Sequence, residues 1–180
     1  MLTIQDQFTK WLETVPLRKA TATNVTKAIT ERVIYRHGCP KCLVSDNGTQ
    51  LKSRQLERCL ETYGIQHRIT PPYTPQCNSI ERTNRTLKTM LAQYVRKNHK
   101  IWDEQLPVLQ YAFNIARHEA TGYSPAYLNH GRELARSHPK DRRPSMTSPA
   151  PDTAHRRLQE AYELVQVHLA RSFSASRETL

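Results

Sequence analysis

The sequence predicts an α/β fold, in which short strands alternate with helices around a modest hydrophobic core. A short apolar run at residues 42–44 reads as a strand, and Asp46 follows it at the edge where open α/β sheets place ligand sites. Residues 53–63 repeat apolar side chains at helical spacing. Residues 65–69 then alternate apolar and polar side chains, as a half-buried strand does. These patterns predict a strand, a helix and a second strand in succession.

The amino-terminal region is typical of a hairpin followed by a helix. Residues 1–8 and 11–17 have strand patterns and flank a tight turn, which predicts an antiparallel hairpin. A helix is predicted over residues 24–36, with Thr23 or Asn24 as its cap. Its apolar face is formed by Val25, Ala28, Ile29 and Val33.

The second half of the chain is predicted to be mostly helical. Residues 71–79 contain three prolines and no periodicity, which indicates a loop ahead of a long helix that begins near Ile80. Another helix is predicted over residues 102–117, and residues 121–132 are rich in turns with room for a short helix. The core stripe expected for the helix at 102–117 is Trp102, Leu106, Leu109, Phe113 and Ala116.

These patterns divide the chain into three parts. Residues 1–134 form a core-like domain, and residues 135–152 form a linker marked by prolines and charges. Residues 153–180 hold an amphipathic helix and a tail, and we expect this helix to dock on the core or on a partner.

The charge of the chain favours a polyanionic partner. Lys and Arg outnumber Asp and Glu by 27 to 16, which gives a net charge of +11. Between Arg82 and Lys100 the sequence has six basic residues and no acid, a run that suits a polyphosphate. No apolar run approaches the roughly 20 residues that a membrane span needs, so we expect a soluble, intracellular protein that does not contact a membrane.

Cys39 and Cys42 have C-x-x-C spacing with His37 just upstream, a pattern that suggests a zinc site. A structural zinc ion needs four ligands, and the sequence offers no second close pair. Free thiols near a strand are therefore the favoured interpretation.

Two acids stand out as candidate metal ligands. Asp46 follows the predicted strand, and Glu81 opens the long helix thirty-five positions later. Carboxylates from two elements can hold a divalent cation through oxygen, and such cations catalyse phosphoryl transfer. Asn84, Arg85 and Lys88 fall on the same face of the helix as Glu81, where the bland alternative is a solvated polar face.

At these residues the chain resembles a known family. Residues 45–51 read S-D-N-G-T-Q-L, and residues 73–88 read Y-T-P-Q-C-N-S-I-E-R-T-N-R-T-L-K. Both segments resemble motifs of the integrase core of gypsy-type retrotransposons and retroviruses, part of a Pol polyprotein. The likeness extends from Leu2 to the T-G-Y-S-P segment at residues 121–125 and to Gly131-Arg132.

The resemblance implies a fold, a chemistry and a set of site residues. The fold would be a ribonuclease H-like mixed sheet flanked by helices. Three carboxylates would bind Mg²⁺ or Mn²⁺ for DNA integration by strand transfer, with Asp46 as the second acid and Glu81 as the third. Homo-oligomers of the family act on DNA, and a functional protein would be nuclear. The DNA-binding residues implied are Tyr73, Gln76, Asn78, Ser79, Asn84, Arg85 and Lys88.

The first acid of the family is missing from the matched segment. The family carries it on a central strand that precedes the strand matched by residues 2–8, so this sequence is expected to lack that strand. Asp6 matches a different acid, at a hairpin turn. We therefore expect impaired catalysis, and the alternative is a catalytically silent DNA-binding or assembly module. A ribonuclease H-type nuclease is a weaker alternative, because the motif around Glu81 belongs to the integrase branch.

Overall fold

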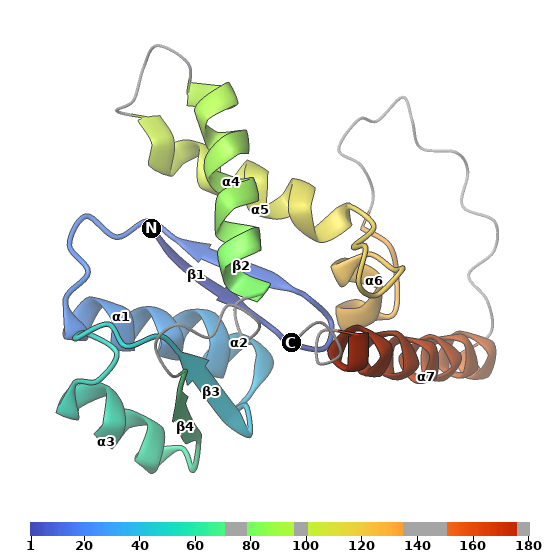
Figure 1. The fold of residues 1–180 in the computed structure, drawn as a ribbon, viewed down its shortest axis with the longest axis horizontal. Coiled ribbons are helices and arrows are strands. Elements are labelled where there is room, and N and C mark those ends of the chain that lie inside the picture. The colour runs from blue at the N-terminus through green and yellow to red at the C-terminus, as the bar shows by residue number, and fades with distance from the viewer. Residues whose placement is uncertain (71–78, 96–100, 135–150, 176–180) are drawn as a thin grey trace. The chain divides into compact units, whose positions relative to one another are not determined.

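The structure is a computed structural model that describes residues 1–70, 79–95, 101–134 and 151–175 (Figure 1). It contains two compact units: unit 1 comprises Met1–Ile4 and Glu13–Leu109, and unit 2 comprises Gln5–Leu12 and Gln110–Leu180. Strands and helices are mixed, which confirms the predicted α/β class. The elements are β1 (Leu2–Gln5), β2 (Leu12–Val15), α1 (Ala22–Ile29), the π-helix η1 (Thr30–Ile34), α2 (Tyr35–His37), β3 (Cys42–Ser45), α3 (Arg54–Thr62), β4 (Gln66–Ile69), α4 (Ser79–Val95), α5 (Trp102–Ile115), α6 (Pro125–His130) and α7 (Pro151–Ala175).

β1 and β2 form the predicted hairpin, although both strands are shorter than their sequence patterns. Asp6 shapes the turn, because its Oδ1 accepts hydrogen bonds from the backbone N–H groups of Phe8 (3.1 Å) and Thr9 (2.6 Å). Lys10 adopts a positive φ of 62°. Burial lowers the pKa of the Lys10 ammonium, and the negative charge of Asp6 acts in the opposite direction. Asp6 is thus a turn-forming residue of the hairpin.

The helical segment at residues 22–37 of unit 1 is interrupted by a π-helical stretch. Thr21 caps it by accepting the Asn24 N–H at 3.3 Å, so the predicted caps Thr23 and Asn24 are wrong and lie inside the helix. η1 begins at Thr30, whose hydroxyl donates to the Thr26 carbonyl at 3.0 Å. Such back-bonding competes with the regular backbone ladder and often accompanies helix distortion.

A buried ion pair fastens the end of this helical segment to β2. Glu13 is only 3% exposed. Its Oε2 lies 3.2 Å from Nη1 of Arg36, and its Oε1 lies 3.1 Å from Nε2 of His37. Two consecutive residues of α2 therefore hold one carboxylate of the hairpin.

β3, α3 and β4 form the predicted strand–helix–strand succession (Figure 1). The two strands pair in parallel, from Cys42 opposite Gln66 to Ser45 opposite Ile69. Parallel strands need a crossover connection, and α3 supplies it. Ser53 caps α3 by accepting the Leu56 N–H at 3.3 Å. The core beneath these elements consists of Val25, Ile29, Ile34, Leu56, Leu60 and Ile65.

Within the described residues, unit 1 contains two separate two-stranded sheets over one core. β1 pairs with β2, and β3 pairs with β4. Leu2, Ile4 and Leu43 nevertheless pack against the same buried cluster. The Gln66 N–H donates to the Lys41 carbonyl and the Thr70 N–H donates to the Ser45 carbonyl. The backbone groups of odd-numbered residues along β3 therefore face β4, and those of even-numbered residues line the edge of β3 that does not face β4.

Unit 2 is centred on the contact between α6 and α7. Leu128, Ala161 and Val165 form its buried cluster. Phe8 meets the ring of Tyr162 edge-on at 5.2 Å, and the Tyr162 hydroxyl donates to the Leu128 carbonyl at 2.7 Å. α7 confirms the amphipathic helix predicted near the carboxyl end. No helix in the described ranges has both the length and the apolar character to cross a membrane.

Asn114 on α5 joins the hairpin to the helical part of unit 2. It is 1% exposed, and its amide makes two hydrogen bonds with the backbone of Leu12. Leu12 N–H donates to Oδ1 at 2.9 Å, and Nδ2 donates to the Leu12 carbonyl at 2.9 Å. Ala116, predicted to be in the core stripe, is exposed instead. The buried polar position on this helix is Asn114, because it supplies partners to an otherwise unpaired strand residue.

We predict that Asn114→Ala lowers the free energy of unfolding by roughly 2–5 kcal/mol, because it leaves two buried backbone groups without partners. Urea unfolding followed by circular dichroism would measure the loss. Asn129→Ala is the matched control, because the Asn129 amide only approaches His130 Nε2 at 3.5 Å. Equal unfolding midpoints for the two variants would contradict this role of Asn114.

A second prediction concerns Glu13. Glu13→Ala should cost about 2–3 kcal/mol, less than the full loss for a buried pair, because Arg36 is half-exposed. Glu31→Ala breaks an exposed pair with Lys27 at 3.8 Å and should cost under about 0.5 kcal/mol. Thermal melts of the two variants would separate the effects. A Glu13→Ala chain as stable as Glu31→Ala would show that the buried pair adds nothing.

Candidate metal and nucleic-acid site

Asp46 lies in a hydrogen-bonded turn at the carboxyl end of β3. Its Oδ1 accepts the Gly48 N–H at 2.9 Å, and Asn47 Nδ2 donates to the Thr70 carbonyl at 2.9 Å. Thr70 in turn donates its N–H to the Ser45 carbonyl at 2.8 Å. The turn is therefore tied to the end of β4, and it presents an exposed carboxylate at the strand end.

A side chain at Gly48 would crowd the flexible side chain of Gln50 and the carboxylate of Asp46. A Cβ at this position would lie 2.7 Å from Nε2 of Gln50 and 3.0 Å from Oδ1 of Asp46. Any larger residue would displace the carboxylate or the amide next to it. The glycine of the S-D-N-G segment thus preserves the space around Asp46.

His67 lies next to the Asp46 turn, whereas the alternating pattern of residues 65–69 indicated only that it belongs to a strand. Its Nε2 lies 2.9 Å from Oγ of Ser45, which also donates to the Asp46 carbonyl at 3.1 Å. The Ser45 hydroxyl thus links the imidazole of His67 to the backbone of the Asp46 turn. The parallel register sets Leu43 opposite His67 and Ser45 opposite Ile69, which brings His67 close to Ser45. The sequence of one strand does not reveal its register with another strand, so this contact could not be predicted.

The acids do not assemble a complete metal centre within the described residues. Asp46 and Glu81 both belong to unit 1, and Glu81 is exposed in the first turn of α4. No group of three or more His, Cys, Asp or Glu side chains that could hold a metal ion exists in the described ranges. The donor set therefore does not fit the three-carboxylate centre that the resemblance implies.

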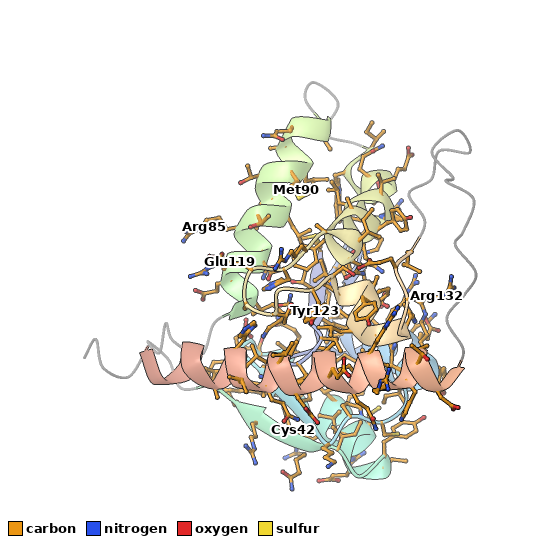
Figure 2. All side chains as sticks on the ribbon, turned by 90° about the vertical axis from the view of Figure 1, so that its right-hand side faces the viewer. Cys42, Arg85, Met90, Glu119, Tyr123 and Arg132 are labelled. Carbon is orange, nitrogen blue, oxygen red and sulfur yellow. The ribbon has the colours of Figure 1, made fainter. Side chains whose placement is uncertain are left out.

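The polar face of α4 is largely open. Glu81, Arg85 and Lys88 are exposed, and Arg85 extends outward from the helix (Figure 2). Thr83, Leu87 and Val95 form the buried side of the helix. Within the described ranges neither Arg85 nor Lys88 takes part in an ion pair. Two unneutralised cations on one face are well placed for phosphate oxygens.

Asn84 has a structural partner that the sequence did not indicate. The Thr3 hydroxyl on β1 donates a hydrogen bond to its Oδ1. This bond spans 81 positions of the chain and fastens α4 to the hairpin. Within the described ranges, the Nδ2 group of Asn84 has no hydrogen-bond partner.

The other residues predicted to contact DNA lie largely outside the part of the chain that the structure describes. Tyr73, Gln76 and Asn78 fall within residues 71–78, which the structure does not describe. Ser79 is described only as the first residue of α4. The assignments of these four residues to DNA contact stay predictions.

Comparison with known proteins agrees with the motifs. The family described as "Integrase core domain" matches residues 1–75. "Gypsy retrotransposon integrase-like protein 1" of Rattus norvegicus is 30% identical over 122 residues, which are 68% of this chain and 23% of that protein. The chain thus spans about a quarter of the length of this relative.

The fold is shared with solved retroviral proteins. A chain of the simian T-cell lymphotropic virus intasome, solved with PP2A regulatory subunit B56 gamma, superimposes with a TM-score of 0.64 at 23% identity and covers 81% of this chain and 52% of that one. The HTLV-2 integrase catalytic core domain, solved with magnesium in a trimeric form, gives a TM-score of 0.59 at 20% identity over 70% of this chain and 81% of that one. Residues 1–75 therefore match the integrase core domain family, the chain is similar in sequence to a gypsy retrotransposon integrase-like protein, and it shares the ribonuclease H-like fold of retroviral integrases.

Proposed function

We propose that this chain binds DNA and derives from a protein that integrates DNA by polynucleotidyl transfer. One observation supports the proposal most strongly. The Asp46 carboxylate, which accepts the Gly48 N–H in its turn, belongs to the same unit as the face of α4 that exposes Glu81, Arg85 and Lys88. Carboxylates at a strand end and cations on a helix are the residue types that phosphodiester chemistry uses.

The DNA contact rests on backbone phosphates. Arg85 and Lys88 lie about one turn apart on α4 and have no acidic partner within the described ranges. With a net charge of +11, the chain attracts a polyanion irrespective of base sequence. Asn84 would add an amide donor, and the residues at 73, 76, 78 and 79 would extend the contact toward the reacting phosphate.

We propose that the 180 residues alone bind DNA without joining it. Two acids, Asp46 and Glu81, are too few for the family's divalent-metal centre, and the described ranges supply no third ligand beside them. This favours the silent DNA-binding or assembly module, for the 180 residues alone, over a chain that joins DNA. The two functions share the α4 contact and differ only in chemistry. Self-association on DNA belongs to the same proposal, and the trimeric form of the related catalytic core supports it.

Salt dependence tests the phosphate contact. Affinity for a duplex should fall steeply between low and physiological salt, because bound cations release counterions from the DNA. Arg85→Ala and Lys88→Ala should each weaken binding to every sequence and reduce the salt slope by about 1. Fluorescence anisotropy across a salt series would give the slopes.

Arg58→Ala is the control for that series, since Arg58 is also an exposed arginine on a helix of unit 1. Its slope should match that of the unmodified chain. A flat salt response, or equal losses in Arg58→Ala and Arg85→Ala, would remove the basis for a DNA contact at α4.

Strand joining tests the chemistry. The purified chain should not join a labelled DNA end to a target duplex in Mg²⁺ or Mn²⁺, because a third ligand is lacking. Glu81→Gln should leave this result and the DNA affinity unchanged within about twofold, since it removes no phosphate donor. Joining that disappears in Glu81→Gln would overturn the proposed inactivity and show that the acids suffice.

A further inference from the structure

Unit 2 contains a cavity that the proposed DNA contact does not use. Its volume is about 430 Å³, and its walls include Arg117, Gly122, Tyr123, Ser124 and Glu133. Most of these residues belong to the T-G-Y-S-P and G-R-E segments. The integrase motifs around Asp46 and Glu81 assign them no role.

Two opposite charges line this cavity without neutralising one another. Arg117 Nε donates to the Gly122 carbonyl at 2.7 Å, which fixes the guanidinium. Ser124, 4% exposed, donates its hydroxyl to Oε2 of Glu133 at 2.7 Å, which fixes the carboxylate. The ion pairs recorded among the described residues do not join Arg117 to Glu133. Within the part of the chain that the structure describes, the terminal N–H groups of Arg117 and Oε1 of Glu133 therefore retain hydrogen-bonding capacity.

The cavity wall is formed by Gly122, with the side chains of Arg117 and His168 against it, and by the ring of Tyr123. Gly122 has φ +75°, a conformation that favours glycine, and a Cβ there would meet Arg117 Nη2 at 3.7 Å and His168 at 3.9 Å. Tyr123 stacks on Tyr127 with ring centroids 5.7 Å apart, which holds the aromatic ring in place. The wall thus combines a fixed aromatic ring with the guanidinium of Arg117.

The chemistry of the walls selects the ligand. A phosphate group would be repelled by Glu133, and a simple cation would be repelled by Arg117. The pair suits a neutral group that carries a donor and an acceptor on one rigid edge. A nucleobase has such an edge, its flat faces suit an aromatic neighbour, and the phosphates beside it suit a chain of net charge +11.

We propose that this cavity receives one unpaired nucleobase of a DNA strand, with Glu133 accepting from the base and Arg117 donating to it. The inference rests on the proposed function, because it takes DNA as the ligand. It adds a base contact to a phosphate contact. The chain should therefore prefer DNA with a single-stranded end over a blunt duplex of equal charge.

The experiment compares two duplexes that carry the same number of phosphates, one blunt and one with a short overhang containing 2-aminopurine. The overhang should bind roughly 5- to 10-fold tighter, as expected for one base held by stacking and hydrogen bonds. Its 2-aminopurine fluorescence should also change on binding. Glu133→Gln and Arg117→Gln should each reduce the preference to about twofold or less.

Glu119→Gln and Arg132→Gln are the matched controls, since these exposed residues flank Tyr123 in Figure 2 and do not line the cavity. Both should keep the preference. An abasic overhang gives a test that needs no variant: it keeps the phosphates, removes the base and should bind like the blunt duplex.

The outcomes separate the two proposals. Equal binding of overhang and blunt duplex, or full preference for the abasic overhang, would overturn the base pocket and leave the phosphate contact intact. Loss of all DNA binding would overturn the proposed function itself. A neutral extended peptide that binds the chain and is lost in Glu133→Gln would assign the cavity to peptides and also overturn the proposal.

Discussion

The site in unit 1 depends on the parallel pairing of β3 with β4. The bonds from Gln66 N to Lys41 O and from Thr70 N to Ser45 O fix the register along the whole strand. That register brings Thr70 to the Asp46 turn, where its carbonyl accepts Asn47, and it places His67 within reach of Ser45. A shift of one residue would turn each side chain of β4 to the other face and separate these groups. The position of the Asp46 carboxylate thus depends on the pairing of β3 with β4 as well as on the local turn.

Local signals in the sequence were sufficient for most of unit 1. Ser53 caps α3, apolar spacing defines its buried face, and the D-N-G segment forms the turn at Asp46, because each of these depends on neighbours within a few residues. Where the prediction was wrong, a competing local partner decided the outcome. Thr21 rather than Thr23 caps α1, since its hydroxyl reaches the Asn24 N–H.

Long-range partners were beyond the sequence. The core stripe predicted for residues 102–117 did not include Asn114, yet Asn114 is buried because it pairs with a strand residue 102 positions away. Asn84 was predicted to contact DNA through its place in the motif, and its bond to Thr3 could not be inferred from helical spacing. Periodicity reports which face of an element is apolar, but it does not report which polar group on another element will meet it. The convergence of Asp46 and Glu81 on a metal ion stays a prediction for the same reason.

The division of the chain into units has a consequence for how it can be taken apart. The hairpin turn, residues 5–12, belongs with residues 110–180, whereas the flanking parts of the hairpin belong with the rest of unit 1. Phe8 supplies a ring to Tyr162, and Leu12 supplies the backbone groups that Asn114 binds. A fragment cut at residue 110 would therefore expose the Tyr162 ring and the Asn114 amide to solvent. Each unit is compact but consists of two separate segments of the sequence, so no single cleavage releases either unit whole.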